Sequence, residues 1–150
     1  MALFSARIID ETPALHEEGV KMRFLGRREG VLPELIEQME WAEAKTADNT
    51  RITLYVAFNY GGRSEILDAA AKYSGGGEEE FRKLLYAPEM HDPDLLIRTS
   101  GEQRISNYLL WQAAYSELHF TDVLWPDFSR ADFEAALASY EARVRRFGGR

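Results

Sequence analysis

The sequence predicts an α/β protein with a parallel β-sheet flanked by helices, and three observations support this class. Strand-like and helix-like segments alternate along the chain, the order that builds right-handed β–α–β units. One strand, residues 51–58, is apolar and β-branched or aromatic almost throughout, as expected for burial on both faces of a covered sheet. Polar loops containing arginine follow the two clearest strands. We expect the 150 residues to form one domain around one core.

The first part of the chain predicts helices around two strands. Residues 1–10 read as the remainder of a helix, and Thr12-Pro13 has the N-cap and N1 order that starts a second, short helix. A short strand over 21–26 precedes a helix over 32–48, whose apolar residues recur at helical spacing. The strand 51–58 follows, so a parallel pair of strands joined by a helix is predicted here.

The second part of the chain continues the alternation. Helices are predicted over 64–73, 78–86, 107–116 and 129–147, and strands over 94–99 and 118–121. The glycine run 74–77 interrupts the pattern as a flexible break. Ser106 or Asn107 begins the helix 107–116, and Asp127 or Ser129 begins the last helix.

Composition excludes several classes of protein. The absence of cysteine excludes thiol catalysis, disulfides and cysteine–zinc sites. A net charge of −7 argues against binding of nucleic acid by the bulk surface. No apolar run approaches the roughly 20 residues of a membrane span, and no signal-peptide pattern opens the chain. We expect a soluble cytoplasmic protein whose contact with a membrane face is at most peripheral.

The loop after the predicted strand 94–99 has the composition of an anion-binding site. Arg98 stands at the strand exit, Arg104 lies in the loop, and the Ser106 hydroxyl stands where the next helix begins. Phosphorylated ligands of α/β proteins bind beyond the carboxyl ends of strands, against free helix N-terminal amides and forked arginine side chains. The alternative is an ordinary loop whose arginines pair with the surplus carboxylates. We favour the anion site.

A second loop of similar character, Asn59 to Arg63, follows the strand 51–58. Its paired glycines would let backbone amides approach a ligand closely, and Arg63 is expected to face the same sheet edge as Arg98. An ordinary strand-to-helix turn with an arginine facing solvent explains the same residues. The sequence leaves these two interpretations equally balanced.

Glu117 and the basic end of the chain are weaker evidence for a binding site when the residues are considered alone. A carboxylate such as Glu117 repels a phosphate unless a hard cation such as Mg²⁺ lies between them, and a lone solvated glutamate is the simpler interpretation. The chain closes with a basic turn containing Arg143, Arg145 and Arg146, which complements the dipole of the last helix. A basic tail could instead reach a bound anion.

The sequence resembles the cis-prenyltransferase family, also called isoprenyl transferases, to which bacterial undecaprenyl diphosphate synthase belongs. The most specific similarity covers 94–117, from Asp-Leu-Leu-Ile-Arg-Thr-Ser-Gly to Ala-Ala-Tyr-Ser-Glu. Shorter matches cover 22–27, 58–63, 125–128 and the closing Arg-Arg-Phe-Gly-Gly of 145–149. The resemblance implies a truncated form of the undecaprenyl diphosphate synthase-like fold.

The resemblance also implies roles for particular residues. Arg98, Arg104 and Ser106 would bind the diphosphate of isopentenyl diphosphate, and Glu117 would help to hold Mg²⁺. Asn59 and Arg63 lie in another shared segment and are included among the substrate-binding residues. The closing Arg146-Phe147-Gly148 is similar to an Arg-x-Gly tail that reaches the neighbouring subunit of a dimer, so Arg146 and Gly148 join the same set. The implied reaction condenses isopentenyl diphosphate with an allylic diphosphate and forms cis double bonds.

The similarity is to the C-terminal portion of the family. The N-terminal His-x-x-Asp-Gly-Asn-x-Arg-Trp motif, which carries the family's catalytic aspartate and its loop for the allylic diphosphate, is absent from these 150 residues. No catalytic residue is therefore assigned. The alternative to an enzyme is a non-catalytic partner subunit, or an inactive fragment, that completes another subunit's site. We accordingly expect a homodimer or a heteromer with a full-length homologue.

Overall fold

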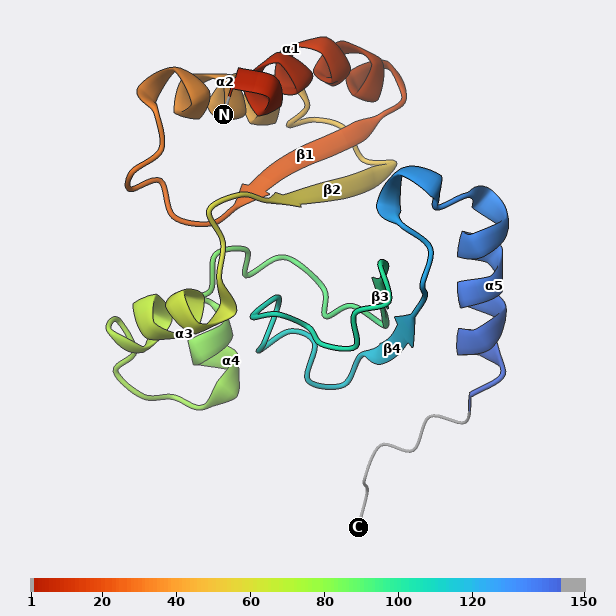
Figure 1. The fold of residues 1–150 in the computed structure, drawn as a ribbon. Coiled ribbons are helices and arrows are strands. Elements are labelled where there is room, and N and C mark those ends of the chain that lie inside the picture. Colours follow the sequence, from red (N-terminus) through yellow and green to blue (C-terminus); the bar gives the residue numbers. More distant parts are fainter. Residues whose placement is uncertain (1, 144–150) are drawn as a thin grey trace. The chain divides into compact units, whose positions relative to one another are not determined.

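The computed structural model describes residues 2–143 (Figure 1). The chain divides into two compact units, Met1–Pro88 and Glu89–Arg150. Both contain a pair of parallel strands with helices, which confirms the predicted α/β class. That the chain forms a single domain stays a prediction.

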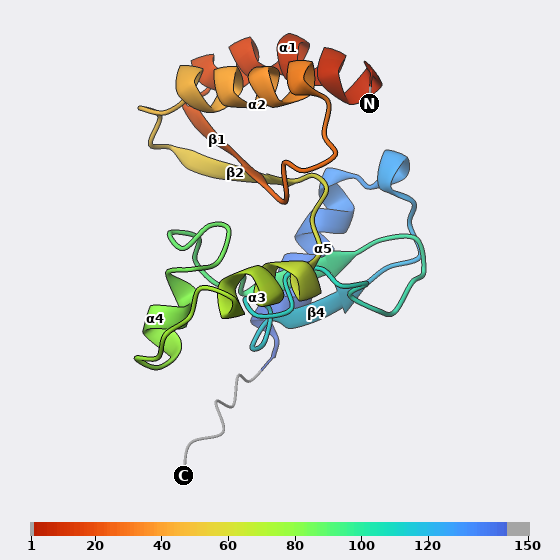
Figure 2. The same cartoon turned by 90° about the vertical axis from the view of Figure 1, so that its left-hand side faces the viewer.

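The first unit is built on a sheet of β1 (Val20–Leu25) and β2 (Ile52–Ala57), which run parallel with Val20 opposite Ile52. Helices α1 (Ala2–Glu17) and α2 (Pro33–Lys45) lie together on one face of this sheet (Figure 2). The core between them consists of apolar side chains from both helices and β1, with Val31 from the loop before α2: Ile8, Met22, Phe24, Val31, Leu35, Met39 and Ala42. The predicted strand–helix–strand unit over 21–58 is confirmed.

Helix α1 differs from the prediction because it continues through Pro13 without a break. A proline inside a helix removes one backbone hydrogen bond and crowds the preceding turn, at a cost of about 3 kcal/mol. Here Ile8 and Leu15, on either side of Pro13, both pack against the same core. The buried Thr12 hydroxyl also donates to the Ile8 carbonyl at 2.5 Å. Tertiary packing therefore overrides the start signal at Thr12-Pro13.

Strand β2 is less buried than its composition predicts. Val56 and Phe58 pack against the core, but Ile52 is 61% exposed and Leu54 is 40% exposed. Within this sheet β2 pairs only with β1, and both α1 and α2 pack against β1. The expectation that residues 51–58 are buried on both faces is therefore wrong.

Two short helices follow β2 in the first unit. Helix α3 (Gly62–Ala70) starts two residues earlier and ends three residues earlier than predicted, and α4 (Glu78–Arg82) is shorter than predicted. Residues 74–77, predicted as a break in the pattern, are irregular, and Gly75, Gly76 and Gly77 all have positive φ. Figure 1 shows α3 and α4 as neighbouring short helices.

The second unit contains a second parallel pair, β3 (Leu95–Arg98) and β4 (Glu117–Phe120), with Leu95 opposite Glu117. A 3₁₀ turn, η1 (Trp125–Asp127), leads to α5 (Arg130–Glu141), which packs on β4. Ser129 caps α5 in a capping box with Asp132, which confirms one of the two predicted starts. Positions 144–147 of the predicted helix lie outside the described residues.

The predicted helix over 107–116 is wrong. Ser106, Asn107 and Leu109 have φ values of 47°, 65° and 45°, in the left-handed region that interrupts a right-handed helix. The backbone bonds here are those of separate turns, for example Tyr108 N to Ile105 O at 2.9 Å and Ala113 N to Leu109 O at 2.8 Å. The helix N-terminus expected beside Ser106 is therefore not formed.

The described strands pair as two two-stranded sheets, β1 with β2 in the first unit and β3 with β4 in the second. The shared sheet edge expected for Arg63 and Arg98 stays a prediction. None of the described helices combines the length and the apolar character needed to span a bilayer.

Candidate functional site

The loop after β3 is braced by its own backbone. Arg98, the last residue of β3, is half-buried, and its carbonyl accepts from the Thr121 amide at 2.9 Å. The amides of Ser100 and Gly101 donate to the carbonyls of Val123 and Thr121 at 2.9 Å each. These two amides therefore hold the loop against the segment after β4.

Arg104 and Ser106 lie farther along the same loop. The Arg104 guanidinium pairs with Glu102, and its side chain is 63% exposed. Ser106 is exposed and has positive φ. The loop thus carries all three predicted anion-binding residues, while the alternative interpretation, an arginine paired with a nearby carboxylate, is observed at Arg104. Such an exposed pair contributes little, so a doubly charged ligand competes for the guanidinium easily.

Glu117 has a specific partner that the sequence did not indicate. It is the first residue of β4, and its Oε2 accepts from Arg143 Nη1 at 2.7 Å. The two side chains are 28% and 34% exposed, so the pair is only partly open to water. Arg143 was noted only as part of the basic turn after the last helix. The basic residues near the end of α5 indicated that an anion could bind there. A separation of 26 residues gives no indication that Arg143 contacts Glu117.

The residues around Glu117 fit a magnesium ion only in part. No group of three or more His, Asp or Glu side chains that could hold a metal occurs between residues 2 and 143. Mg²⁺ is commonly bound by one or two carboxylates together with phosphate oxygens and water. Glu117 can supply one carboxylate oxygen, provided that Arg143 releases it. A diphosphate would have to supply further ligands. Arg146 and Gly148 lie outside the described residues.

In the first unit, Asn59 ties together the loops that follow β1 and β2. Its φ is 52°, and its side-chain amide donates to the carbonyls of Arg27 at 2.9 Å and Glu29 at 3.1 Å. The Arg27 amide donates in return to the Asn59 carbonyl at 3.2 Å. The side-chain nitrogen of this predicted substrate-binding residue is thus used to fix one loop against another.

Gly26 allows these two loops to approach so closely. Its φ is 128°, and a β-carbon placed there would lie 2.0 Å from the Phe58 carbonyl oxygen. No side chain fits at that distance, so only glycine permits this contact.

Arg63 is exposed in the first turn of α3, next to a buried carboxylate that the sequence analysis did not single out. Glu65 is 1% exposed. Its Oε2 accepts from the Tyr60 hydroxyl at 2.6 Å, and its Oε1 accepts from the Tyr86 amide at 3.0 Å. Glutamate is common in the exposed first turn of a helix, so no local pattern indicates that this one is buried.

A cavity of about 390 Å³ in the first unit is lined mostly by charged side chains, of which Arg27 and Asp68 pair with each other. Its lining residues are Arg27, Arg28, Glu29, Asp68, Ala71, Lys72 and Tyr86. The Arg27 guanidinium donates to both oxygens of Asp68, at 2.6 and 2.9 Å, and the Tyr86 hydroxyl donates to Asp68 at 2.5 Å. The hydrogen bonds from Arg27 and then from Tyr86 lower the pKa of Asp68 to about 2. Burial, with the bond to Asp68, raises the pKa of Tyr86 to about 12.

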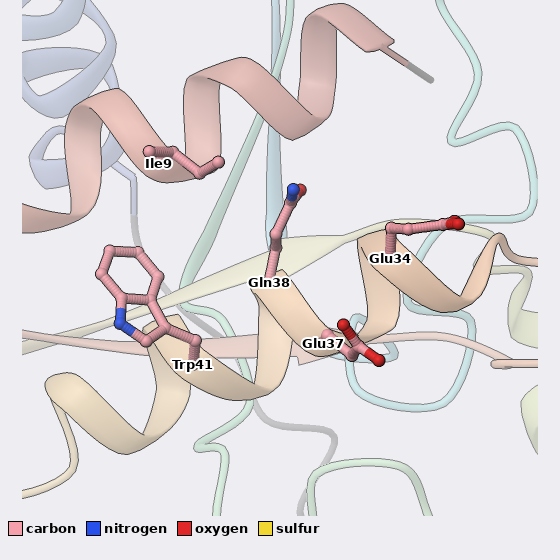
Figure 3. A pocket seen from close by; sticks show the side chains of 5 residues that line it. All are labelled: Ile9, Glu34, Glu37, Gln38 and Trp41. Carbon is pink, nitrogen blue, oxygen red and sulfur yellow. The ribbon is translucent and has the colours of Figure 1, made fainter.

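Another cavity, of about 370 Å³, lies between α1 and α2 (Figure 3). Gln38 and Trp41 extend from α2 toward Ile9 of α1, and Glu34 and Glu37 stand at its margin. Two carboxylates beside an apolar floor repel a diphosphate. None of the predicted site residues lines this cavity, so we do not assign it to the candidate site.

The family of this chain is shown by comparison with known proteins. The model of the prenyltransferase family, described as putative undecaprenyl diphosphate synthase, matches residues 1–148. The chain belongs to this family. The match includes both arginine loops, residues 98–106 and 59–63, and all but the last two residues of the basic C-terminus. The family suggested by the sequence is therefore confirmed.

Curated relatives of this prenyltransferase-family chain are named isoprenyl transferases. It is 50% identical to the one from Thermotoga maritima, over 99% of this chain and 68% of that protein. It is 48% identical to isoprenyl transferase 2 of Bradyrhizobium diazoefficiens (95% and 61%) and 45% identical to the protein of Caulobacter vibrioides (99% and 62%). The chain thus spans 61 to 68% of the length of these relatives.

Solved structures confirm the fold of the prenyltransferase family. Lavandulyl diphosphate synthase from Lavandula x intermedia, solved with dimethylallyl diphosphate, superposes with a TM-score of 0.93 at 32% identity, over 99% of this chain and 70% of that one. A probable undecaprenyl diphosphate synthase from Campylobacter jejuni gives 0.89 at 27% identity, over 99% and 72%. The undecaprenyl diphosphate synthase-like fold implied by the resemblance is therefore confirmed.

Proposed function

We propose that this chain acts in cis-prenyl transfer, the condensation of isopentenyl diphosphate with an allylic diphosphate to give a cis-polyprenyl diphosphate. The observation that carries the proposal is the family match over residues 1–148, which includes the braced loop with Arg98 and Arg104. In this proposal, residues 98–106 and Glu117 form the half-site for isopentenyl diphosphate.

The loop's chemistry suits a diphosphate. Arg98 at the end of β3 and Arg104 farther along the loop present two guanidinium groups, each able to form forked bonds with phosphate oxygens. Arg104 exchanges Glu102 for the ligand, and the Ser106 hydroxyl donates one more bond. These residues bind and orient the diphosphate of isopentenyl diphosphate, and orientation and charge neutralisation are the main contributions a protein makes to such a transfer.

Magnesium enters the proposal through Glu117. When bound, Mg²⁺ supplies positive charge to the diphosphate, and Glu117 would hold it together with phosphate oxygens. Arg143 keeps the carboxylate hydrogen-bonded when no metal is present. Binding of the metal therefore requires Arg143 to exchange its partner.

The other predicted binding residues, partners and location are part of the same proposal. Asn59 and Arg63 serve a diphosphate from the loop after β2, and Arg146 and Gly148 serve the site of a neighbouring subunit in a homodimer or a heteromer with a full-length homologue. The chain acts in the cytoplasm, and its contact with a membrane face is peripheral. No nucleic acid takes part.

A second candidate is a non-catalytic partner subunit that completes the site of another chain. One observation favours keeping it: residues 2–143 contain no cluster of metal-binding carboxylates, so in this candidate the other chain supplies further metal ligands. In this candidate the half-site around Arg98 and Arg104 works only in an assembly.

A prenyl-transfer assay separates the two candidates. The chain is incubated with Mg²⁺, labelled isopentenyl diphosphate and an allylic diphosphate, alone and mixed with a full-length homologue whose own loop arginines are changed to alanine. The matched control is this chain with Arg98→Ala and Arg104→Ala. Product from the chain alone supports the enzyme, and product only from the mixture supports the partner. If neither the chain nor the mixture exceeds the control, both candidates are wrong.

A further inference from the structure

Helix α3 carries two carboxylates, Glu65 and Asp68, that organise the end of the first unit's sheet. They are three residues apart, so they lie on one side of the helix. Glu65 accepts from Tyr60, which precedes the helix, and from Tyr86, which follows α4. Asp68 accepts from Arg27, which follows β1, and again from Tyr86. Three separate segments therefore converge on these two side chains.

The Glu65 side chain holds the loop after β2, because its Oε2 accepts from the Tyr60 hydroxyl at 2.6 Å. The bond from the Glu65 amide to the Gly61 carbonyl, at 3.0 Å, is the first backbone bond of α3 and joins the same loop to the helix. A carboxylate that is 1% exposed is costly to bury unless hydrogen bonds compensate it, so these partners are strongly preferred. The conformation of residues 60–62 is thus fixed from inside the protein.

Tyr86 extends this restraint. Its amide donates to Glu65 Oε1, its hydroxyl donates to Asp68 Oδ2, and its ring meets that of Tyr60 edge-on with centroids 6.1 Å apart. Asn59 adds a third tie, to the carbonyls after β1. The short segment before Arg63 is therefore held on several sides.

We propose that Glu65 is a positioning residue that fixes Tyr60 to Gly62 and thereby places the Arg63 guanidinium for a diphosphate group. The inference rests on the proposed function, because it takes Arg63 as a ligand-binding residue. Arg63 itself is exposed in the first turn of α3, two residues before Glu65. A side chain there depends on the backbone that leads into the helix, and Glu65 anchors that backbone.

The test measures binding of isopentenyl diphosphate to the full chain by calorimetry, together with the unfolding midpoint. Tyr60→Phe removes one hydroxyl and leaves Glu65 Oε2 without that donor, and we expect the dissociation constant to rise about tenfold. Glu65→Ala gives at least the same loss. Glu65→Gln keeps the size and still accepts from the Tyr86 amide, so it retains most of the affinity.

A matched control separates positioning from stability alone. Thr46 is also buried, and its hydroxyl accepts from the Met22 amide at 2.9 Å near the start of β1, at the other end of the sheet. Thr46→Val removes a buried hydrogen bond in the same unit. It lowers the unfolding midpoint, and we expect it to leave the dissociation constant unchanged.

A double-mutant cycle with Arg63→Ala measures whether the effect of Tyr60→Phe on the dissociation constant depends on Arg63. If Glu65 acts through Arg63, Tyr60→Phe has no further effect on binding once Arg63 is alanine. Tyr60→Phe with unchanged affinity, or an equal loss in the presence and absence of Arg63, overturns the inference while the proposed function stands. A wild-type chain that does not bind isopentenyl diphosphate overturns both.

Discussion

Arg143 donates to Glu117 at 2.7 Å, so the carboxylate that the family resemblance assigns to a metal is held by a guanidinium instead. Both side chains are partly exposed, and a pair of this kind is held by a modest free energy. The pair therefore acts as a competitor of Mg²⁺ rather than as a barrier to it. This relationship gives the first of five predictions.

Replacement of Arg143 by glutamine should tighten magnesium binding. The change removes the competing cation, and we expect the apparent dissociation constant for Mg²⁺ to fall about two- to fivefold, measured by titration with isopentenyl diphosphate present. Arg130→Gln is the control, because Arg130 forms a pair of the same length, 2.7 Å, with Glu134 in α5, and this pair involves no proposed metal ligand. Equal or weaker magnesium binding by the Arg143 variant contradicts the assignment of Glu117.

Arg104→Ala should weaken binding of isopentenyl diphosphate by about 1.5–3 kcal/mol, the usual loss for a hydrogen bond to a charged group. Glu102→Gln should act in the opposite direction, because it removes the carboxylate that occupies Arg104. Calorimetry on both variants measures the two effects. An unchanged affinity after Arg104→Ala counts against the loop as the diphosphate site.

Stability should decline at both extremes of pH through one network. The pKa of Asp68 is about 2, below the ordinary value of about 4, so its contribution to folding is present above pH 4 and lost as the pH falls toward 2. The pKa of Tyr86 is raised to about 12 from an ordinary value of about 10, so its contribution is present below pH 10 and lost as the pH rises toward 12. Unfolding midpoints measured across this range should flatten on the acid side in Asp68→Asn and on the alkaline side in Tyr86→Phe.

Ser129→Ala should destabilise the second unit by about 1 kcal/mol, because it removes the side chain that caps α5. Hydrogen bonds from Ser129 lower the pKa of Asp132, so the capping box is complete above the ordinary pKa of an aspartate and weakens as the pH falls below it. Urea unfolding at neutral and at acidic pH measures this. If the variant and the wild type differ equally at both pH values, the coupling to Asp132 is absent.

Self-association is the fifth prediction. Each described sheet has two strands, so each strand pairs along one edge only within its sheet, and Ile52 and Leu54 of β2 are largely exposed. Open edges and exposed apolar side chains favour association with another chain. Sedimentation should detect a dimer or larger species, and Ile52→Lys should shift it toward monomer. A wild-type chain that sediments only as a monomer contradicts this prediction.

Local sequence patterns predicted most of the elements. The apolar and β-branched runs located β1 to β4 to within about a residue or two, and the Ser129 start signal was correct because the cap is formed by neighbouring residues. The break at Thr12-Pro13 was wrong because packing on both sides of the proline outweighed a local signal. The predicted helix over 107–116 was wrong because three residues take left-handed backbone conformations that helical spacing does not reveal.

The candidate site was predictable only in its composition. The loop residues Arg98, Arg104 and Ser106 could be named from the sequence because they follow a recognisable strand. Their partners could not, since Glu117 and Arg143, like Glu65 and Tyr86, are brought together by folding across 26 and 21 residues. Burial of Glu65 also depends on segments that no local pattern connects to it.

The close approach at Gly26 sets a limit on how this protein can vary. Because even the methyl group of an alanine would overlap the Phe58 carbonyl, position 26 accepts no residue other than glycine while the two loops stay in contact. Any substitution at this glycine must first move the loops after β1 and β2 apart, and this also breaks the hydrogen bonds that Asn59 donates from one loop to the other.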